Sequence, residues 1–329
     1  MSESSTRLRD LVPGQDFLGF CVVRKVEQRV TRNGKIYLLV ELGDTSGRLR
    51  ARWWNRPADW EKICPAGQVV KVKARAVQVE DRVELNILRL RPARAGDAVR
   101  PEDLLPASQK DVADLQHRFY QHLGSIQNPH LKALLNRIFD EPEFERRFFQ
   151  APAGKLWHHA YLYGMLEHVV CMLDLSEVLA SHYPQLNLEL LKCGIVLHDL
   201  GKVWEYATTR GFVDFTDEGR LIGHPVIGQN QLREWVSRQP DFPSELVLQL
   251  LHLMLSADAL SGVGSPVQPM TLEAAALACL NQLDGLVNAF ARIGEKDVLP
   301  GSRWSKFNNL LNRFVYVGQK AQDGPAENQ

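Results

Sequence analysis

The chain has 329 residues, 45% hydrophobic and 24% charged, and its 39 Lys and Arg balance its 39 Asp and Glu. This composition excludes a disordered or low-complexity protein, and the length predicts two domains with a substantial core. No apolar run approaches the roughly 20 residues of a membrane span and the first residues are polar, so we expect a cytoplasmic protein with no membrane contact.

The five cysteines are widely spaced and form no Cys-x-x-Cys pair, which predicts reduced core thiols instead of disulfides or a thiolate zinc site. They are Cys21, Cys64, Cys171, Cys193 and Cys279.

The net charge of zero conceals an asymmetry. Residues 1–100 hold 20 Lys and Arg against 12 Asp and Glu, a balance of +8, so the remainder carries −8. The N-terminal third is therefore the part suited to a polyanion, although a solvated basic surface that aids solubility is the simpler alternative.

Alternating, β-branched runs between Phe17 and Ala93 predict five short strands. The runs lie at 20–23, 36–40, 49–53, 69–74 and 83–87. Asn33-Gly34 predicts a hairpin turn between the first two runs, and Asp44 to Gly47 another before the third. Five such strands are typical of a small closed barrel of OB type.

Basic and aromatic residues alternate along the middle strands, as a single-strand binder needs cations for phosphates and rings for bases. The candidates are Arg29, Arg32, Lys35, Tyr37, Arg50, Arg52 and Trp54. Because adjacent strand residues face opposite ways, one of Trp53 and Trp54 is expected to fill the barrel interior. The alternation favours Trp54, with Arg50 and Arg52, on the outer face.

A Pro- and Gly-containing stretch follows the barrel, and the periodicity then becomes helical. Helical runs are predicted at 112–123, 130–139, 160–180, 188–197, 226–236, 244–255 and 271–291, with a short hairpin within 207–223 lying over the site. The predicted boundaries are a polar segment 1–14, a nucleic-acid-binding barrel 15–95, a linker 96–110, a helical domain 111–317 and a disordered tail 318–329.

The most informative motif is His198-Asp199-Leu200-Gly201-Lys202, which follows the apolar run from Leu190 to Leu197. A metal ion held between imidazole and carboxylate would satisfy both polar groups in such surroundings. His168, His224 and Asp284 complete an ordered set of nitrogen and oxygen donors. Each has a simpler alternative, a core or capping histidine or a surface acid, and Gly201 could be only a helix C-cap.

These motifs, together with Lys155 to His159, Gly164 to His168, Gly264-Ser265-Pro266 and Leu283-Asp284, resemble the HD superfamily of metal-dependent phosphohydrolases. The closer resemblance is to YhaM-type 3′-to-5′ exoribonucleases. It implies a small all-β OB-type barrel followed by an all-α HD domain, from about Phe17 to Tyr316. It also implies a first metal on His168, His198, Asp199 and Asp284.

The second metal of binuclear HD sites would use Asp199 as a bridge together with His224. Where the family carries a His-His pair, this chain has Ala257-Asp258, which leaves Asp258 as the available substitute. We therefore expect one tightly held divalent ion, Mn²⁺ in preference to Mg²⁺, Fe²⁺ or Zn²⁺. His252, on an apolar helix, is expected to be structural.

The resemblance implies metal-assisted attack of water on a phosphodiester, with Asp199 at the centre. Lys202 is placed to contact a substrate phosphate, although a solvent-exposed cation at a helix end is an alternative. His159, in preference to His158, is the expected site neighbour.

Three functions fit. The first is a 3′-to-5′ exoribonuclease on single-stranded RNA, or single-stranded DNA, for which the family resemblance implies a homo-oligomer. The second is a nucleic-acid-binding protein whose HD domain is weakly active or inactive, which the missing His-His pair favours. The third is a hydrolase of small nucleotides, which we disfavour because it gives the barrel no function.

Overall fold

The structure is a computed structural model that describes residues 7–80, 82–97, 99–155, 158–208, 212–261, 265–296, 298, 302–309 and 311–318. The predicted disordered tail, apart from Gly318, and part of the predicted N-terminal segment lie outside these residues. The chain divides into two compact units. One comprises Met1–Gln109, Tyr161–Tyr163 and Lys202–Gly223, and the other Lys110–Ala160, Gly164–Gly201 and His224–Gln329. The predicted domain boundaries stay a prediction.

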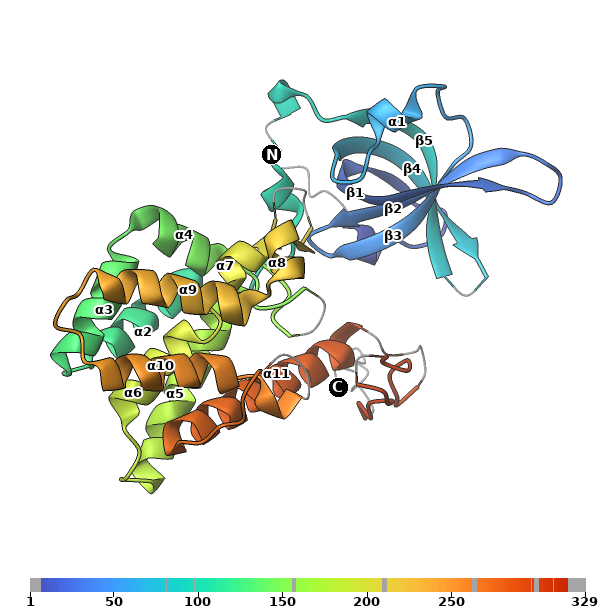
Figure 1. The fold of residues 1–329 in the computed structure, drawn as a ribbon. Coiled ribbons are helices and arrows are strands. Elements are labelled where there is room, and N and C mark those ends of the chain that lie inside the picture. The colour runs from blue at the N-terminus through green and yellow to red at the C-terminus, as the bar shows by residue number, and fades with distance from the viewer. Residues whose placement is uncertain are drawn as a thin grey trace, which may run out of the picture. The chain divides into compact units, whose positions relative to one another are not determined.

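The five strands of the first unit form a closed barrel in the order β1-β2-β3-β5-β4 (Figure 1). They are β1 (Asp16–Val30), β2 (Ile36–Asp44), β3 (Gly47–Trp53), β4 (Val69–Val79) and β5 (Arg82–Pro92). All pairs are antiparallel except β3 with β5. The predicted OB-type barrel is confirmed, and full closure leaves no exposed sheet edge to aggregate.

The alternation of the strands separates the barrel interior from its surface. Val70, Val72, Ala74 and Ala76 of β4 are fully buried in one core cluster, while the residues between them face outward. Trp53 is 3% exposed and belongs to the same core. The expectation that one of the two tryptophans fills the interior is confirmed for Trp53.

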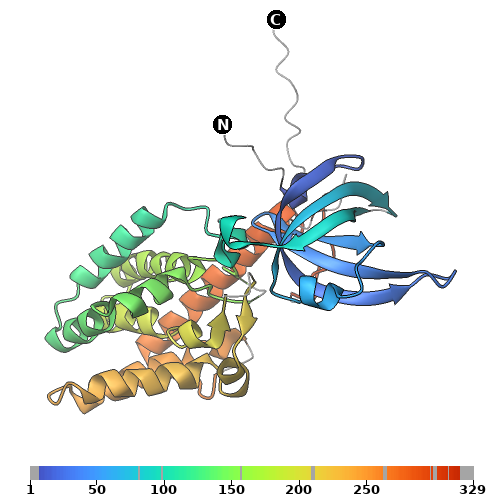
Figure 2. The same cartoon turned by 90° about the horizontal axis from the view of Figure 1, so that it is seen from above.

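Both predicted hairpin turns are present. Gly34 has a φ of 77° at the tip of the β1–β2 hairpin, which an L-residue adopts only with strain. Asp44 accepts hydrogen bonds from the amides of Ser46 and Gly47 at 2.8 and 3.1 Å, and so closes the β2–β3 turn. Figure 2 shows the same strands from above.

Short elements follow the barrel. The linker contains 3-10 turns at η2 (Ala95–Asp97) and η3 (Pro101–Leu104). The predicted hairpin is present as β6 (Tyr206–Ala207) paired with β7 (Asp214–Phe215). Because the hairpin and the candidate site belong to different units, its predicted place over the site stays a prediction.

The described residues of the second unit are mainly helical up to Lys296, which confirms the predicted all-α HD domain. The α-helices are α1 (Trp60–Ile63), α2 (Val112–Gly124), α3 (Pro129–Phe139), α4 (Pro142–Gln150), α5 (Gly164–His182), α6 (Leu188–Leu197), α7 (Lys202–Glu205), α8 (Asp217–Leu221), α9 (His224–Ser237), α10 (Ser244–Ser256) and α11 (Leu272–Lys296). Within the described residues, none of these helices combines the length and apolar character that a membrane crossing needs.

Two departures from the predicted helices have physical causes. The helix expected from Ala160 begins only at Gly164, because His159 and Tyr163 have positive φ values of 44° and 63° that no α-helix accommodates. The sequence reasoning also missed α4, a short charged helix with Pro142 at its first turn. Its Phe144, Phe148 and Phe149 nevertheless pack in the core.

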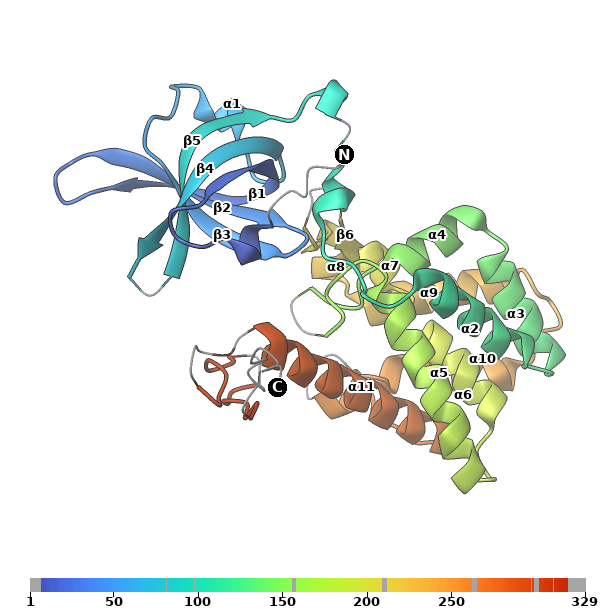
Figure 3. The same cartoon turned by 180° about the vertical axis from the view of Figure 1, so that it is seen from behind.

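In the helical unit, α5, α6, α10 and α11 lie side by side (Figure 3). Helix α6 sits centrally in this group, since it contacts α5, α10 and α11. Its residues from Leu190 to Leu197 are all buried. They are apolar except for Lys192, whose ammonium contacts Ser125 and Glu177. The packing brings the C-terminal end of α6 against residues from α5 and α11.

Candidate metal centre

The end of α6 presents the His-Asp pair to the interior. His198 and Asp199 are each 1% exposed. His198 is the C-cap of α6, and its Nδ1–H donates to the Ile195 carbonyl at 2.8 Å. Because this bond uses Nδ1, the Nε2 lone pair is left as the acceptor, the tautomer that a metal ligand requires.

His168 on α5 is arranged in the same way. Its Nδ1–H donates to Asp284 Oδ2 on α11 at 2.6 Å. Its Nε2 is buried, has no hydrogen-bond partner among the described residues, and lies 3.9 Å from Asp199 Oδ2. A buried nitrogen that lacks a hydrogen bond is costly unless another group satisfies it.

The donor atoms of His168, His198 and Asp199 lie within 4.8 Å of one another. His198 Nε2 is 3.4 Å from Asp199 Oδ2. Two donors that share an ion at about 2.1 Å are roughly 3.0 to 3.4 Å apart, in octahedral or tetrahedral geometry. The chemistry and spacing of the group therefore fit a divalent ion once His168 moves closer to Asp199.

Asp284 lies on the far side of His168 from this donor group. Its Oδ2 also accepts from His159 Nε2 at 2.8 Å, and His159, His168 and Asp284 form a second group of potential ligands. In this geometry Asp284 orients the imidazole of His168, as outer carboxylates do for metal-bound histidines. Whether it also ligates the ion, as the resemblance implies, stays a prediction.

The carboxylate of Asp284 is held ionised. Burial raises its pKa, but the hydrogen bonds from His159 and His168 outweigh burial and keep the pKa below its usual range. Burial lowers the pKa of His159 despite the opposing effect of Asp284. The arrangement is a neutral imidazole donating to a carboxylate.

The other oxygen of Asp199 faces a third group. His224 Nε2 lies 3.5 Å from Asp199 Oδ1 and 3.2 Å from Asp258 Oδ2, and these three residues are close enough to share an ion. Asp258 thus occupies the place for which the sequence offered it as a substitute. Since Oδ2 of Asp199 faces the first group and Oδ1 the third, one carboxylate adjoins both.

The sequence reasoning missed Asn281 and Asn288, which share the buried face of α11 with Asp284. Asn281 Nδ2 donates to Asp258 Oδ1 at 3.0 Å and to the Ala257 carbonyl at 3.2 Å. Asn288 Oδ1 accepts from the His159 amide at 2.9 Å. Asn281, Asp284 and Asn288 are spaced at i, i+3 and i+7, so they share one helix face. This spacing of polar residues on an otherwise apolar face could have predicted them as part of the site.

Close backbone approach explains two glycines. A Cβ on Gly201 would lie 2.0 Å from the His224 carbonyl oxygen, so the start of α9 can pass the His-Asp turn only because this residue is glycine. A Cβ on Gly164 would lie 2.1 Å from the His159 carbonyl oxygen. The C-cap interpretation of Gly201 is therefore wrong: its φ is not positive, and crowding is the reason.

Lys202 and His252 answer two open questions. Lys202 is 7% exposed, which contradicts the alternative of a solvent-exposed cation. His252 accepts a hydrogen bond from the Met270 amide at 2.9 Å, which fits the structural role expected of it.

The barrel face predicted to bind nucleic acid carries an aromatic pair. Tyr37 and Trp54 stack with centroids 4.7 Å apart, and Lys35 lies over Trp54. Arg50 is exposed, and Arg32 and Lys35 with it. Arg29 and Arg52, by contrast, form ion pairs with Glu27 and Glu84. The outward orientation of Arg50, Arg52 and Trp54 agrees with the prediction.

All five cysteines are free. Cys21, Cys64 and Cys193 are buried, and burial raises the pKa of Cys64 to about 11. The prediction of core thiols is wrong for Cys279, which is exposed because it lies on the outer face of α11.

An OB-type barrel combined with a helical unit that holds a buried His-Asp donor group defines an HD-type metal-dependent phosphohydrolase with an added barrel domain. Residues 165–284 match the family described as HD domain. The chain is 31% identical over 297 residues to the 3′-5′ exoribonuclease YhaM of Geobacillus sp. (strain WCH70). The alignment covers 90% of each protein. It is 30% identical over 305 residues to that of Shouchella clausii (strain KSM-K16), which covers 92% of this chain and 93% of the relative.

The chain therefore belongs to the YhaM family of 3′-5′ exoribonucleases, and it is a metal-dependent nuclease. Among solved structures, the second OB-fold domain of replication protein A from Methanococcus maripaludis aligns with a TM-score of 0.23 and 19% identity. That alignment covers 27% of this chain and 94% of the other. The barrel assignment rests on strand order, not on this alignment.

Proposed function

We propose that this protein degrades single-stranded RNA from its 3′ end, and single-stranded DNA less efficiently or not at all. The observation that carries the proposal is the position of Asp199, whose two oxygens face two donor groups, His168 with His198 and His224 with Asp258. A divalent ion in such a site supplies Lewis acidity for attack of water on a phosphodiester.

The residues of the chain have distinct tasks in this proposal. His168 and His198 present Nε2, and their Nδ1 bonds to Asp284 and Ile195 hold the imidazoles in place before substrate arrives. His159 fixes Asp284 from the other side. Lys202 offsets negative charge that develops on the phosphoryl group. The Tyr37–Trp54 pair gives bases a surface on which to stack.

We also propose one tightly held ion, Mn²⁺ in preference to Mg²⁺, Fe²⁺ or Zn²⁺, in the group of His168, His198 and Asp199. The third group, Asp199 with His224 and Asp258, offers a single imidazole and shares Asp199 with the first ion, so we expect it to bind a second ion more weakly. Elemental analysis of the purified protein tests this proposal, and two tight ions per chain would contradict it.

The experiment on function uses RNA labelled at its 5′ end and incubated with the full chain and Mn²⁺. Progressive shortening of the labelled strand is expected on single-stranded RNA, with slower shortening of duplex RNA and of DNA. An RNA labelled at its 3′ end should instead release the label at once as a mononucleotide. Products no different from those of the Asp199→Ala variant would refute the proposal.

The Ala257-Asp258 pair favours a second candidate, a nucleic-acid-binding protein with a weakly active or inactive HD domain. Ala257 is 4% exposed and has no ligating group. Strong RNA binding with bound metal but no shortening would favour this candidate. A small-nucleotide hydrolase would instead act on free nucleotides and ignore RNA.

A cytoplasmic location is supported by the five cysteines without a disulfide, as a reducing compartment maintains them. A homo-oligomer stays a prediction from the family resemblance, which light scattering of the purified protein tests.

A further inference from the structure

The outer face of β4 and β5 carries cations at directly opposed positions. In the strand register, Lys73 lies opposite Arg89 and Lys71 opposite Arg91. On the other side of β4, Leu18 of β1 lies opposite Lys73 and Phe20 opposite Lys71. Two rows therefore cross β1, β4 and β5, which are neighbours in the barrel (Figure 1), and each row runs from an apolar residue to two cations.

Opposed like charges destabilise a sheet, because their side chains lie about 5 Å apart. Among the described residues, no ion pair involves Lys71, Lys73 or Arg89, and the ammonium of Lys71 lies over the ring of Phe20. Only Arg91 is neutralised, by Asp97 at 2.7 Å. In the row of Lys73 and Arg89 no carboxylate of the described residues compensates this repulsion, and a bound anion would relieve it.

The barrel face predicted from sequence differs in this respect. Its Arg29 and Arg52 are already paired with Glu27 and Glu84, and Arg48 with Glu41. A phosphate must compete with these carboxylates for the guanidinium groups. On the β4–β5 face Arg91 is likewise paired, with Asp97, but Lys71, Lys73 and Arg89 form no ion pair with a described residue and can meet phosphates directly.

The two rows border a groove of about 510 Å³ on the barrel. Its lining includes Lys71, Lys73, Arg89 and Arg91, with Leu18 and Leu88, and contains no acidic residue. Leu18 is 61% exposed and Leu88 51%. Cations for a backbone and apolar surface for bases are the two components of a single-strand binding site.

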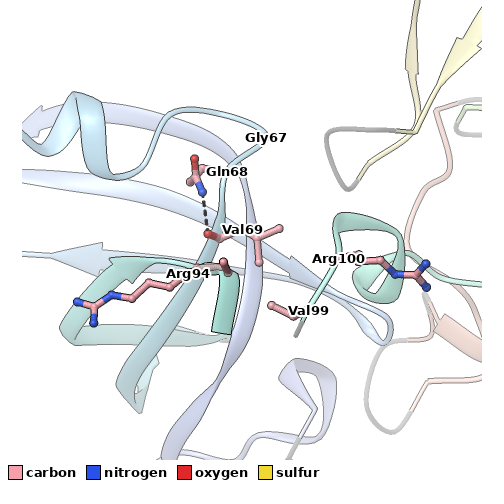
Figure 4. Close-up of a pocket in the computed structure, with 8 residues that line it drawn as sticks. Gly67, Gln68, Val69, Arg94, Val99 and Arg100 are labelled. Carbon is pink, nitrogen blue, oxygen red and sulfur yellow. Dashed lines mark hydrogen bonds between the residues drawn. The ribbon is translucent and has the colours of Figure 1, made fainter. Parts of the chain in front are cut away.

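A second hollow on the barrel lacks this character. It is lined by Gly67, Gln68, Val69, Arg94, Val99 and Arg100, among others. In Figure 4 the side chains of Arg94 and Arg100 point in opposite directions, and Arg100 is paired with Asp103 at 2.9 Å. The cations of this hollow are not directed at a common ligand.

We propose that the β4–β5 groove binds the phosphodiester backbone of a single-stranded nucleic acid, as a second contact surface on the barrel. The inference rests on the proposed nuclease function for its choice of strand. The occupant follows from charge complementarity, since the groove presents four cations and no acid. The strand contributes phosphates to the two rows and bases to Leu18, Phe20 and Leu88.

The test is Lys73→Glu in the full chain, with Arg75→Glu as the matched control. Both residues are exposed, face outward from β4 and undergo the same change in charge. Arg75, however, lies outside the groove, between Asn86 of β5 and Asp16 of β1, whose carboxylate is 3.8 Å away. Binding of a fluorescein-labelled single-stranded RNA is measured by anisotropy over a salt series in EDTA, so that no hydrolysis occurs.

Lys73→Glu should weaken RNA binding about tenfold at low salt and reduce the salt slope by about 0.7 or more, since at least one phosphate contact is lost. Its melting temperature should be unchanged or higher, because the substitution places a carboxylate opposite Arg89. The control should bind within about twofold of the unaltered protein. Weaker binding with retained thermal stability cannot come from unfolding.

An unchanged affinity and salt slope for Lys73→Glu would overturn the proposal. An equal loss of affinity in Arg75→Glu would also overturn it, because the change in net charge alone would then explain the loss. A third measurement separates the two proposals. Hydrolysis of a trinucleotide, which offers too few phosphates to engage both rows of the groove, reports the nuclease alone. Absence of hydrolysis with a groove effect intact would refute the nuclease function and leave the groove standing.

Discussion

Asp199 holds the candidate site together, because its two oxygens face different donor groups. Replacing Asp199 or His198 with Ala should remove bound metal and abolish hydrolysis, while binding of single-stranded RNA changes little because it is assigned to the barrel. Elemental analysis, a nuclease assay and anisotropy check the three expectations. Asp241→Ala, which removes an exposed acid of the same unit, should behave as the unaltered protein. A variant that keeps full activity would contradict the site.

Asn281 positions Asp258, so the prediction for Asn281 concerns only the third donor group, Asp199 with His224 and Asp258. Asn281→Ala should weaken binding of a second Mn²⁺ about 10- to 100-fold, the typical effect of losing an outer-shell partner, and leave the first ion in place. Titration of Mn²⁺ followed by electron paramagnetic resonance measures both. The neighbouring Gln282→Ala, on the exposed side of α11, serves as control. Equal loss of both ions would instead indicate a general defect of α11.

At the scale of elements, the meeting of the α6 turn and α9 depends on Gly201. Gly201→Ala should destabilise the protein by about 1 to 3 kcal/mol, because the methyl group would collide with backbone atoms that cannot rotate away. Gly124→Ala at the end of α2, where nothing lies within 4 Å, should stabilise by about 0.5 to 1 kcal/mol. Urea unfolding measures both changes, and equal signs would contradict the argument.

The elements also show what the sequence could predict. Period-two alternation and the Asn33-Gly34 turn specify strands through local sterics, so the barrel followed from the residues alone. The His198-Asp199 motif predicted the candidate site because its two polar residues directly follow an apolar run. Asn281 and Asp258 could not be paired in advance, since their contact depends on the packing of α10 against α11. The delayed start of α5 depends on two backbone conformations that no propensity signals.

At the scale of the whole molecule, the uneven charge distribution predicts that strand capture depends on the barrel. RNA affinity of the full chain should fall steeply with salt, and Arg50→Glu should weaken it for every sequence tested. Arg52 is a less clean probe than the sequence indicated, because it pairs with the buried carboxylate of Glu84 at 2.8 Å. Anisotropy with several RNA sequences makes the measurement, and salt-independent binding would argue for a protein partner.

The division of the chain between its two units governs how it can fold during synthesis. The chain passes from one unit to the other five times, after Gln109, Ala160, Tyr163, Gly201 and Gly223. A ribosome that has finished the barrel strands has not yet produced the last part of their compact unit, Lys202–Gly223. At about 5 to 20 residues per second, those residues follow Gln109 after roughly 5 to 25 s. During that interval the nascent barrel lacks part of its native surroundings, and an early stop codon before Gly223 would leave both units incomplete.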